Sequence, residues 1–211
     1  MRIEAMADHA HRVLVLGKKS WSATDLHMAQ GMFRVYQNFV ELLNDSEKDT
    51  LTGLMNRRGL LDTANHLFEQ LHPERDRLVV MFADLDKFKR INDTHGHAAG
   101  DEVLKRFARI LRDSLRGHDV AARLGGDEFV IILNNTGIDK AEDIARRIQE
   151  QVAHCAQRHS LDYSVTIGLG EAPTHGTTLS DLLAQVDRAL YHAKGRENGG
   201  GIMRACHLEM S

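Results

Sequence analysis

Two short apolar segments separated by a pair of glycines constrain the fold of this chain more than any other feature. Residues 120–124 and 129–133 each have the composition of a strand, and Gly125 and Gly126 lie between them. Glycine accepts the positive φ angles of a tight turn, so the two segments are predicted to pair as an antiparallel hairpin. The chain is therefore expected to build a sheet.

Around this hairpin, helical and strand patterns alternate from about residue 49 onwards, which predicts an α/β or α+β domain. Further strands are expected at 78–83, 163–169 and 201–205. Helices are expected at 99–115, after an opening Asp139-x-x-Glu142 pattern, and after a Thr178-x-x-Asp181 cap.

Residues 1–47 are predicted to form a separate N-terminal segment ahead of a domain over 48–211. The apolar run at 13–16 is typical of one strand, the closing strand of a structure upstream, and 22–44 has a helical pattern. Five apolar residues of that helix recur at spacings of 3 and 4: Ala29, Met32, Tyr36, Phe39 and Leu43. The repeat covers about two heptads, whereas a coiled coil needs about three or four. A helix packed on its own domain and a dimer seam both remain open.

Charge and cysteine content exclude several classes of protein. Lys and Arg number 27 and Asp and Glu 30, a net charge of −3 that gives no indication of a nucleic-acid polymer as partner. Cys155 and Cys206 match neither a zinc site nor a disulfide framework, which suits a reducing cytoplasm. No apolar run approaches the roughly 20 residues that span a bilayer, and the first residues lack the apolar region of a signal peptide. We expect a cytoplasmic protein with no membrane segment in this chain.

Two acids, Asp127 and Glu128, follow the glycines of the hairpin directly. Because Gly125 and Gly126 have no Cβ, phosphates could lie directly on the backbone there. Acids beside such a gap indicate a bridging cation, and Mg²⁺ is the natural one. The alternative, a surface hairpin with two solvated acids, would be favoured if this motif stood alone.

A second acidic stretch begins where the apolar strand 78–83 ends. A carboxylate at the end of such a strand, here Asp84, stands where α/β folds bind ligands. Asp84 and Asp86 share one side of the extended chain, and the carbonyl of Leu85 is free to face a metal ion.

Four motifs together make the sequence recognisable. They are DTLTGLMNRR at 49–58, the stretch 84–101, GGDEF at 125–129 and ALYHAK at 189–194. With these motifs in this order and spacing, the chain resembles the GGDEF family of diguanylate cyclases from Asp49 to about Asn198. The resemblance implies an α+β fold like that of nucleotide cyclases and polymerase palms, a central, mostly antiparallel five-stranded sheet flanked by helices. It also implies the condensation of two GTP into cyclic di-GMP with release of two pyrophosphates, assisted by Mg²⁺ or Mn²⁺.

The resemblance assigns roles residue by residue. The metal ligands would be Asp84, the carbonyl of Leu85, and Asp127. The catalytic residues would be Asp127, Glu128 and Lys89. The substrate-binding residues would be Asn92, His97, Asp101, Gly125, Gly126 and Lys194. An inhibitory site for the product would comprise Arg116, Asp119 and Arg147, the last supplied by a neighbouring molecule.

Two of these roles have a physical basis and one local pattern departs from the family. An acid such as Asp101 can accept from both N1–H and the 2-amino group of guanine, donors that adenine lacks, although an acid is also a common helix cap. A two-metal clamp suits the charge that develops during phosphoryl transfer.

The family usually has Gly-Arg-Asn two residues after Lys194, but here Gly195-Arg196 follows at once, so Arg196 is not assigned.

Each subunit would bind one GTP, so catalysis needs a homodimer, as the two-fold symmetry of the product also demands. A non-catalytic receptor for GTP or cyclic di-GMP is the alternative, and the intact hairpin acids favour the enzyme. A cyclase for other nucleotides is disfavoured by Asn92 and Asp101.

Overall fold

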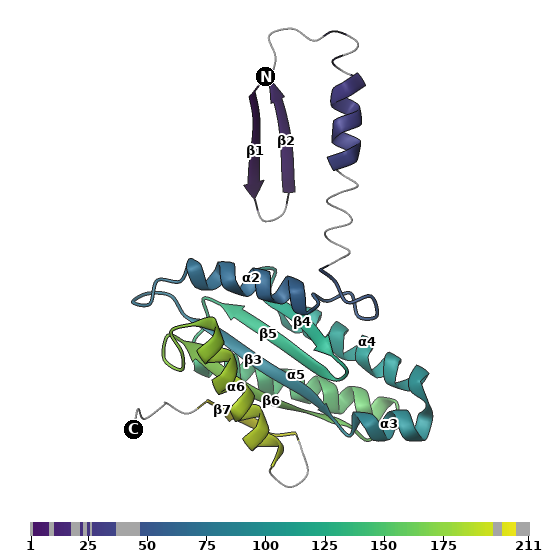
Figure 1. Ribbon diagram of the computed structural model, residues 1–211. Helices are drawn as coiled ribbons and strands as arrows, with labels where there is room; N and C mark the ends of the chain where they lie inside the picture. Colours follow the sequence, from purple (N-terminus) through teal and green to yellow (C-terminus); the bar gives the residue numbers. More distant parts are fainter. Residues whose placement is uncertain are drawn as a thin grey trace. The chain divides into compact units, whose positions relative to one another are not determined.

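The computed structural model describes residues 2–8, 11–17, 22, 25, 27–36, 47–195 and 200–205 (Figure 1). The chain divides into two compact units between residues 46 and 47. Within these described ranges, no helix combines the length and the apolar character needed to cross a membrane.

The first unit contains a β-hairpin and a helix. Strand β1 (Arg2–Asp8) pairs antiparallel with β2 (His11–Gly17), and residues 27–36 are helical. The apolar run at 13–16 is thus part of β2, which pairs with β1 of the same chain. The predicted helix is observed at 27–36; Phe39 and Leu43 of its repeat lie outside the described residues.

The second unit contains a five-stranded sheet in the order β4-β5-β3-β6-β7. Its strands are β3 (Leu78–Asp86), β4 (Val120–Gly125), β5 (Glu128–Asn134), β6 (Ser164–Ala172) and β7 (Ile202–Arg204). Its helices are α2 (Arg57–Glu69), α3 (Phe88–His95), α4 (His97–Ser114), α5 (Ile138–Arg158) and α6 (Leu179–Lys194). All strand pairs are antiparallel except β6 with β7. The predicted α+β architecture and the predicted hairpin are therefore confirmed.

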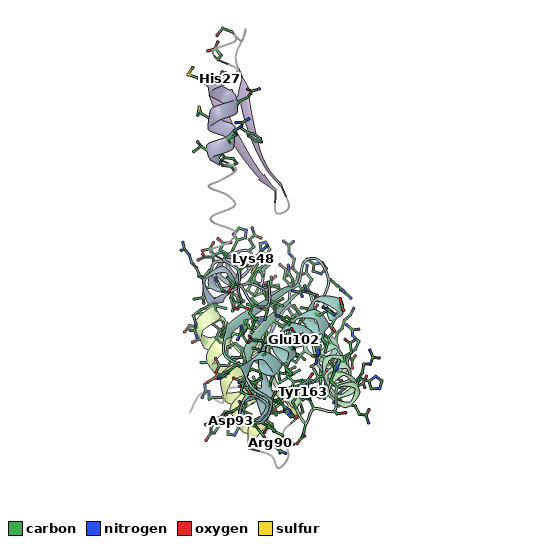
Figure 2. All side chains as sticks on the ribbon, turned by 90° about the vertical axis from the view of Figure 1, so that its right-hand side faces the viewer. His27, Lys48, Arg90, Asp93, Glu102 and Tyr163 are labelled. Carbon is green, nitrogen blue, oxygen red and sulfur yellow. The ribbon has the colours of Figure 1, made fainter. Side chains whose placement is uncertain are left out.

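The side chains of the central strand β3 alternate between two apolar layers. Val79 and Met81 pack with buried residues of α4 and α5, whereas Val80 packs on the opposite face with residues of α2 and α6. Figure 2 shows α6 and α5 on opposite sides of the sheet. Each fully buried aliphatic side chain in these layers contributes roughly 1.5–3 kcal/mol. Because side chains alternate along a strand, Asp84 projects on the face that α6 covers.

Helix α6 lies unusually close to β6 because of a glycine. A Cβ at Gly168 would stand 2.5 Å from the backbone nitrogen of Leu190 and 2.6 Å from the carbonyl oxygen of Val186. The helix begins as predicted, since the Oγ1 of Thr178 accepts a hydrogen bond of 3.1 Å from the backbone of Asp181. Glycine at position 168 thus fixes how deep α6 sits, and Lys194 is its last residue.

The predicted start of α5 is wrong in one respect. The helix begins at Ile138 with Gly137 as its N-cap, and neither Asp139 nor Glu142 caps it. Arg204 of β7 instead pairs with both acids, at 2.7 Å from Asp139 and 2.6 Å from Glu142. The two carboxylates that the predicted capping box would use are thus paired with an arginine of a distant strand.

Candidate functional site

The two acidic motifs meet where β3 ends beside the β4–β5 turn. Asp84 stands directly opposite Glu128 in the antiparallel ladder, and the N–H of Leu85 donates to the carbonyl of Asp127 at 3.3 Å. Gly126 in the turn has a φ of +52°, a conformation that glycine adopts without strain. Hydrogen bonding between strands therefore brings Asp127 beside the end of β3.

An open hollow of about 370 Å³ lies at this junction. Its lining combines three carboxylates with three lysines: Asp84, Asp86, Asp127, Lys87, Lys89 and Lys194, together with Leu85 and Phe88. The structure thus brings Asp84, Asp127, Lys89 and Lys194, all predicted site residues, to one place.

Asp84 is the buried acid of the hollow, with 10% of its side chain exposed. Burial raises the pKa of Asp84, and the like charges of Asp127 and Asp86 raise it further. The Lys194 ammonium, 2.6 Å from Oδ2 of Asp84, opposes these effects without cancelling them. A divalent cation beside Asp84 would oppose these effects, because it would stabilise the ionised form of the buried carboxylate.

Asp86, the other acid of β3, is already engaged. Its carboxylate accepts from the hydroxyls of Ser164 at 2.6 Å and Thr166 at 2.7 Å, and from the N–H of Gly200 at 2.8 Å. The two oxygens are thus directed at protein donors, which leaves Asp84 and Asp127 as the acids available to a cation.

The residues present suit a Mg²⁺-type ion. Among the described residues, no group of three or more His, Cys, Asp or Glu side chains could hold a metal. Mg²⁺, however, is usually bound through one or two carboxylates, with substrate phosphates and water completing the shell. Asp84 and Asp127 supply such a pair, and the carbonyl of Leu85 remains a predicted ligand.

Glu128 occupies a different position from Asp127. It is exposed, and it lines a neighbouring cavity of about 290 Å³ together with Arg57 and Asp187. Because Glu128 is paired with Asp84, the two side chains project from the same face of the sheet. Glu128 therefore stands beside the hollow rather than in its lining.

The residues predicted to read the base lie on α3 and α4. Asn92 packs so tightly on α4 that a Cβ at Gly100 would stand 2.0 Å from its Oδ1. Asp101 follows Gly100 directly and is exposed, as is His97 at the start of α4. Asn92 thus packs against the residue that precedes Asp101, and neither Asn92 nor Asp101 is in the lining of the hollow.

The residues predicted to bind product gather after α4. Arg116 is exposed, and Nη2 of Arg147 donates to the carbonyl of Ser114, the last residue of α4, at 2.8 Å. Only 3% of the Asp119 side chain is exposed, and its carboxylate accepts from the N–H groups of Arg116 at 2.9 Å and Asn134 at 3.3 Å. In this conformation Asp119 shapes the turn that presents Arg116.

Two contacts near the site have no counterpart in the sequence-based assignment. The guanidinium of Arg123 donates to the carbonyl of Gly126 and pairs with Asp49. The hydrogen bonds of Asp86 are the second. In the sequence, the only indication of a role for Asp86 was that it lies on the same side of the strand as Asp84. Its hydrogen-bond partners could not be predicted, because all of them are distant in sequence.

A comparison with known families matches residues 46–199 to the family described as "Diguanylate cyclase, GGDEF domain". The chain belongs to the GGDEF family. The sheet flanked by helices and the hairpin acids described above are those of a GGDEF domain.

Individual relatives agree with this assignment. The chain is 38% identical to the response regulator PleD of Caulobacter vibrioides over 164 residues, covering 74% of this chain and 36% of PleD. It is 36% identical to diguanylate cyclase TpbB of Pseudomonas aeruginosa over 171 residues, covering 79% of this chain and 39% of TpbB. The chain thus spans well under half of either relative.

Solved structures of GGDEF domains have the same fold. The GGDEF domain of TpbB superposes with a TM-score of 0.67 at 36% identity, covering 74% of this chain and 98% of that one. The GGDEF domain of DgcB from Caulobacter crescentus, in complex with c-di-GMP, superposes with a TM-score of 0.64 at 25% identity. That match covers 75% of this chain and 95% of the DgcB domain.

Proposed function

We propose that this GGDEF chain is an active diguanylate cyclase of a bacterial cytoplasm, which condenses two GTP into cyclic di-GMP and releases two pyrophosphates. The observation that best supports this activity is the single hollow in which Asp84 and Asp127 face Lys89 and Lys194. Carboxylates for a cation and ammonium groups for phosphates are what transfer to an α-phosphate requires.

In this proposal Asp84 and Asp127 would hold Mg²⁺ or Mn²⁺, with the carbonyl of Leu85 as a further ligand. When bound, the divalent cations stabilise charge on the attacking and leaving oxygens. Asp127, or a water that it holds, accepts the proton of the attacking 3′-hydroxyl. Glu128, across the ladder from Asp84, supports this acid group from the side of the hairpin.

The phosphates of GTP would lie between the hairpin backbone and the lysines. Gly125 and Gly126 present backbone without side chains, and Lys89 neutralises charge on the phosphates. Lys194 pairs with Asp84 in the structure. A cation held by Asp84 would replace that partner, so the Lys194 ammonium becomes available to the triphosphate.

Selection of guanine would rest on Asn92 and Asp101, with His97 nearby. Asp101 accepts from N1–H and the 2-amino group, and a base without these donors leaves the acid poorly paired. Leaving a polar group unpaired when it is desolvated costs about 1–3 kcal/mol, which favours GTP over ATP.

The product has two-fold symmetry and is built from two GTP, so two subunits would face each other with one GTP each. Product inhibition would act through Arg116, whose planar guanidinium can meet O6 and N7 of guanine together. Arg147 of a neighbouring molecule would join this site. The c-di-GMP complex of the related DgcB domain supports product binding to this kind of domain.

One experiment tests the proposal directly. The chain is incubated with GTP and Mg²⁺, and cyclic di-GMP and pyrophosphate are measured by mass spectrometry and a coupled assay. The Asp127→Asn variant serves as the control and should give neither product. Binding of GTP or cyclic di-GMP without turnover would instead identify a non-catalytic receptor.

A further inference from the structure

The loop between α6 and β7 is fastened to β3 at both of its described ends. At one end Lys194 pairs with Asp84 at 2.6 Å, and at the other the N–H of Gly200 donates to Asp86 at 2.8 Å. Asp84 and Asp86 are alternate residues of one strand, so both project from the same face, about 7 Å apart. Two neighbouring carboxylates thus hold the two ends of one loop.

The attachment at Gly200 involves more than one bond. Its N–H also lies 3.0 Å from Oγ1 of Thr166, and its carbonyl accepts from Nε2 of Gln149 at 2.8 Å. Its φ of +73° belongs to the left-handed region, which favours glycine. The backbone at residue 200 is therefore held by β3, β6 and α5 together.

Asp86 is the centre of this attachment. It accepts from two hydroxyls of β6, those of Ser164 at 2.6 Å and Thr166 at 2.7 Å, as well as from Gly200. Bonds to an ionised acceptor are roughly twice as strong as bonds between neutral groups, and these distances are typical of them. Two of these bonds go to Oδ2 and one to Oδ1, so both carboxylate oxygens of Asp86 already accept hydrogen bonds from the protein.

We infer that Asp86 is a positioning residue for the phosphate lysine, not a metal ligand: it anchors the end of the loop that begins at Lys194. This inference rests on the proposed binding of GTP phosphates by Lys194. Because Gly200 stays bonded to Asp86 when Lys194 leaves Asp84 for a triphosphate, less conformational entropy is lost when Lys194 engages the phosphates. The anchor therefore acts on the affinity for GTP and leaves the transfer step to Asp84 and Asp127.

The first test compares Asp86→Ala with Asp143→Ala, a change of the same kind at an exposed aspartate of α5. Loss of the anchor should raise the KM for GTP about tenfold, with kcat at saturating GTP changed less than about threefold. The Mg²⁺ concentration for half-maximal rate at saturating GTP should not move. A metal ligand would behave differently: kcat would collapse as in Asp84→Asn and the Mg²⁺ requirement would rise, which would overturn the inference.

Coupling provides the second test. If Asp86 acts through Lys194, the effects of Asp86→Ala and Lys194→Ala on KM are not additive, and the double variant resembles Lys194→Ala alone. Ser164→Ala removes one donor to Asp86 and is the gentler variant should Asp86→Ala fold poorly. It should raise KM in the same direction, about threefold, and fully additive effects would contradict the inference.

Hydrogen exchange separates this inference from the proposed activity. In Asp86→Ala and Ser164→Ala, amides of the peptide covering residues 200–205 should exchange faster than in the wild type, whether or not GTP is present. Unchanged exchange would disprove the anchor. A wild-type chain that makes no cyclic di-GMP would disprove the proposed function, while the exchange result would still decide the anchor.

Discussion

Arg123 and Asp49 form an ion pair that connects the start of the GGDEF domain to its acidic hairpin. Nη1 of Arg123 lies 3.3 Å from both carboxylate oxygens of Asp49, while Nε and Nη2 donate to the carbonyl of Gly126 at 3.0 and 2.8 Å. Only 13% of the arginine side chain is exposed. One planar guanidinium therefore holds the turn beside Asp127 against the segment through which the chain enters the domain.

Replacing Arg123 by Lys should lower kcat. An ammonium keeps the charge but cannot serve Asp49 and Gly126 at once, because it lacks the fixed fork of a guanidinium. We expect about a tenfold loss of kcat, with little change in the thermal midpoint, measured by pyrophosphate release. Arg75→Lys, at a side chain that is 72% exposed, is the matched control. Equal rates for both variants would show that the turn needs no such support.

Asp49 should make the domain more sensitive to acid. Burial alone would raise the pKa of Asp49, but hydrogen bonds from Thr52 and the charge of Arg123 outweigh it, and the pKa is lowered. An acid with a lowered pKa stabilises the fold above its ordinary value of 3.8, and this stabilisation disappears as the pH falls through the lowered value. Urea unfolding of wild type between about pH 6 and pH 3 should therefore show a steeper loss of stability than that of Asp49→Asn. Parallel curves would contradict this assignment.

Asp84→Asn should abolish synthesis and yet stabilise the metal-free domain. Burial and the charges of Asp127 and Asp86 raise the pKa of Asp84, so its ionised form costs stability above the folded pKa, and this cost vanishes below the ordinary value of 3.8. Asparagine removes the cost, and the thermal midpoint at pH 7 in EDTA should be higher than that of the wild type. The difference should shrink as the pH falls towards 3.8. A lower midpoint at pH 7 would mean that the ion pair with Lys194 outweighs burial.

Gly100→Ala should weaken recognition of guanine. A Cβ at this position would stand 2.0 Å from Oδ1 of Asn92, so the amide must move from its place against α4. We expect kcat/KM for GTP to fall about tenfold and that for ATP to fall less, because ATP lacks the guanine that Asn92 is proposed to read. Gly31→Ala, where a Cβ would meet nothing within 4 Å, is the matched control. An unchanged ratio of the GTP and ATP rates would remove Asn92 from base selection.

Arg116→Ala should relieve product inhibition while initial rates with GTP stay unchanged. A bidentate contact of a guanidinium with guanine is worth about 1–3 kcal/mol, so inhibition by added cyclic di-GMP should weaken about tenfold or more. A variant of Asp119 would not be equivalent to Arg116→Ala, because the Asp119 carboxylate also holds the turn by accepting from the N–H groups of Arg116 and Asn134. Inhibition curves that superimpose for wild type and Arg116→Ala would leave Arg116 as a solvated cation after α4.

Regular periodicity made most of the sheet and the long helices predictable from the sequence. Strand β3, the β4–β5 hairpin, β6 and helices α4 to α6 all have an apolar period or a turn motif that can be recognised in the sequence. The start of helix α2 is marked in the sequence by an N-cap residue, Asn56, whose side chain accepts hydrogen bonds from the N–H groups of Arg58 and Gly59. Helix α3 has no such mark in the sequence, because it spans only eight residues and its N-cap, Lys87 at a φ of +62°, makes no side-chain capping hydrogen bond.

The motif residues of the site could be predicted from the sequence, but the contacts that hold the site in place could not. Asp84 and Asp127 could be named because they lie in two of the four motifs by which the chain resembles the GGDEF family. The partners of Asp86, in contrast, lie 78 to 114 residues away in sequence and meet it only in the folded sheet. The same holds for Arg123 and Asp49, which are 74 residues apart.

Gly168 fixes how far Lys194 lies from the point at which α6 contacts β6. Because Gly168 lets the backbone at Leu190 rest against β6, the distance from this resting point to Lys194 is one helical turn, about 6 Å along the axis. One residue inserted or deleted within that turn would swing the lysine by about 100° around the axis and carry its ammonium off the acid that it faces. The length of this segment is therefore as much a requirement of the site as the identity of its acids.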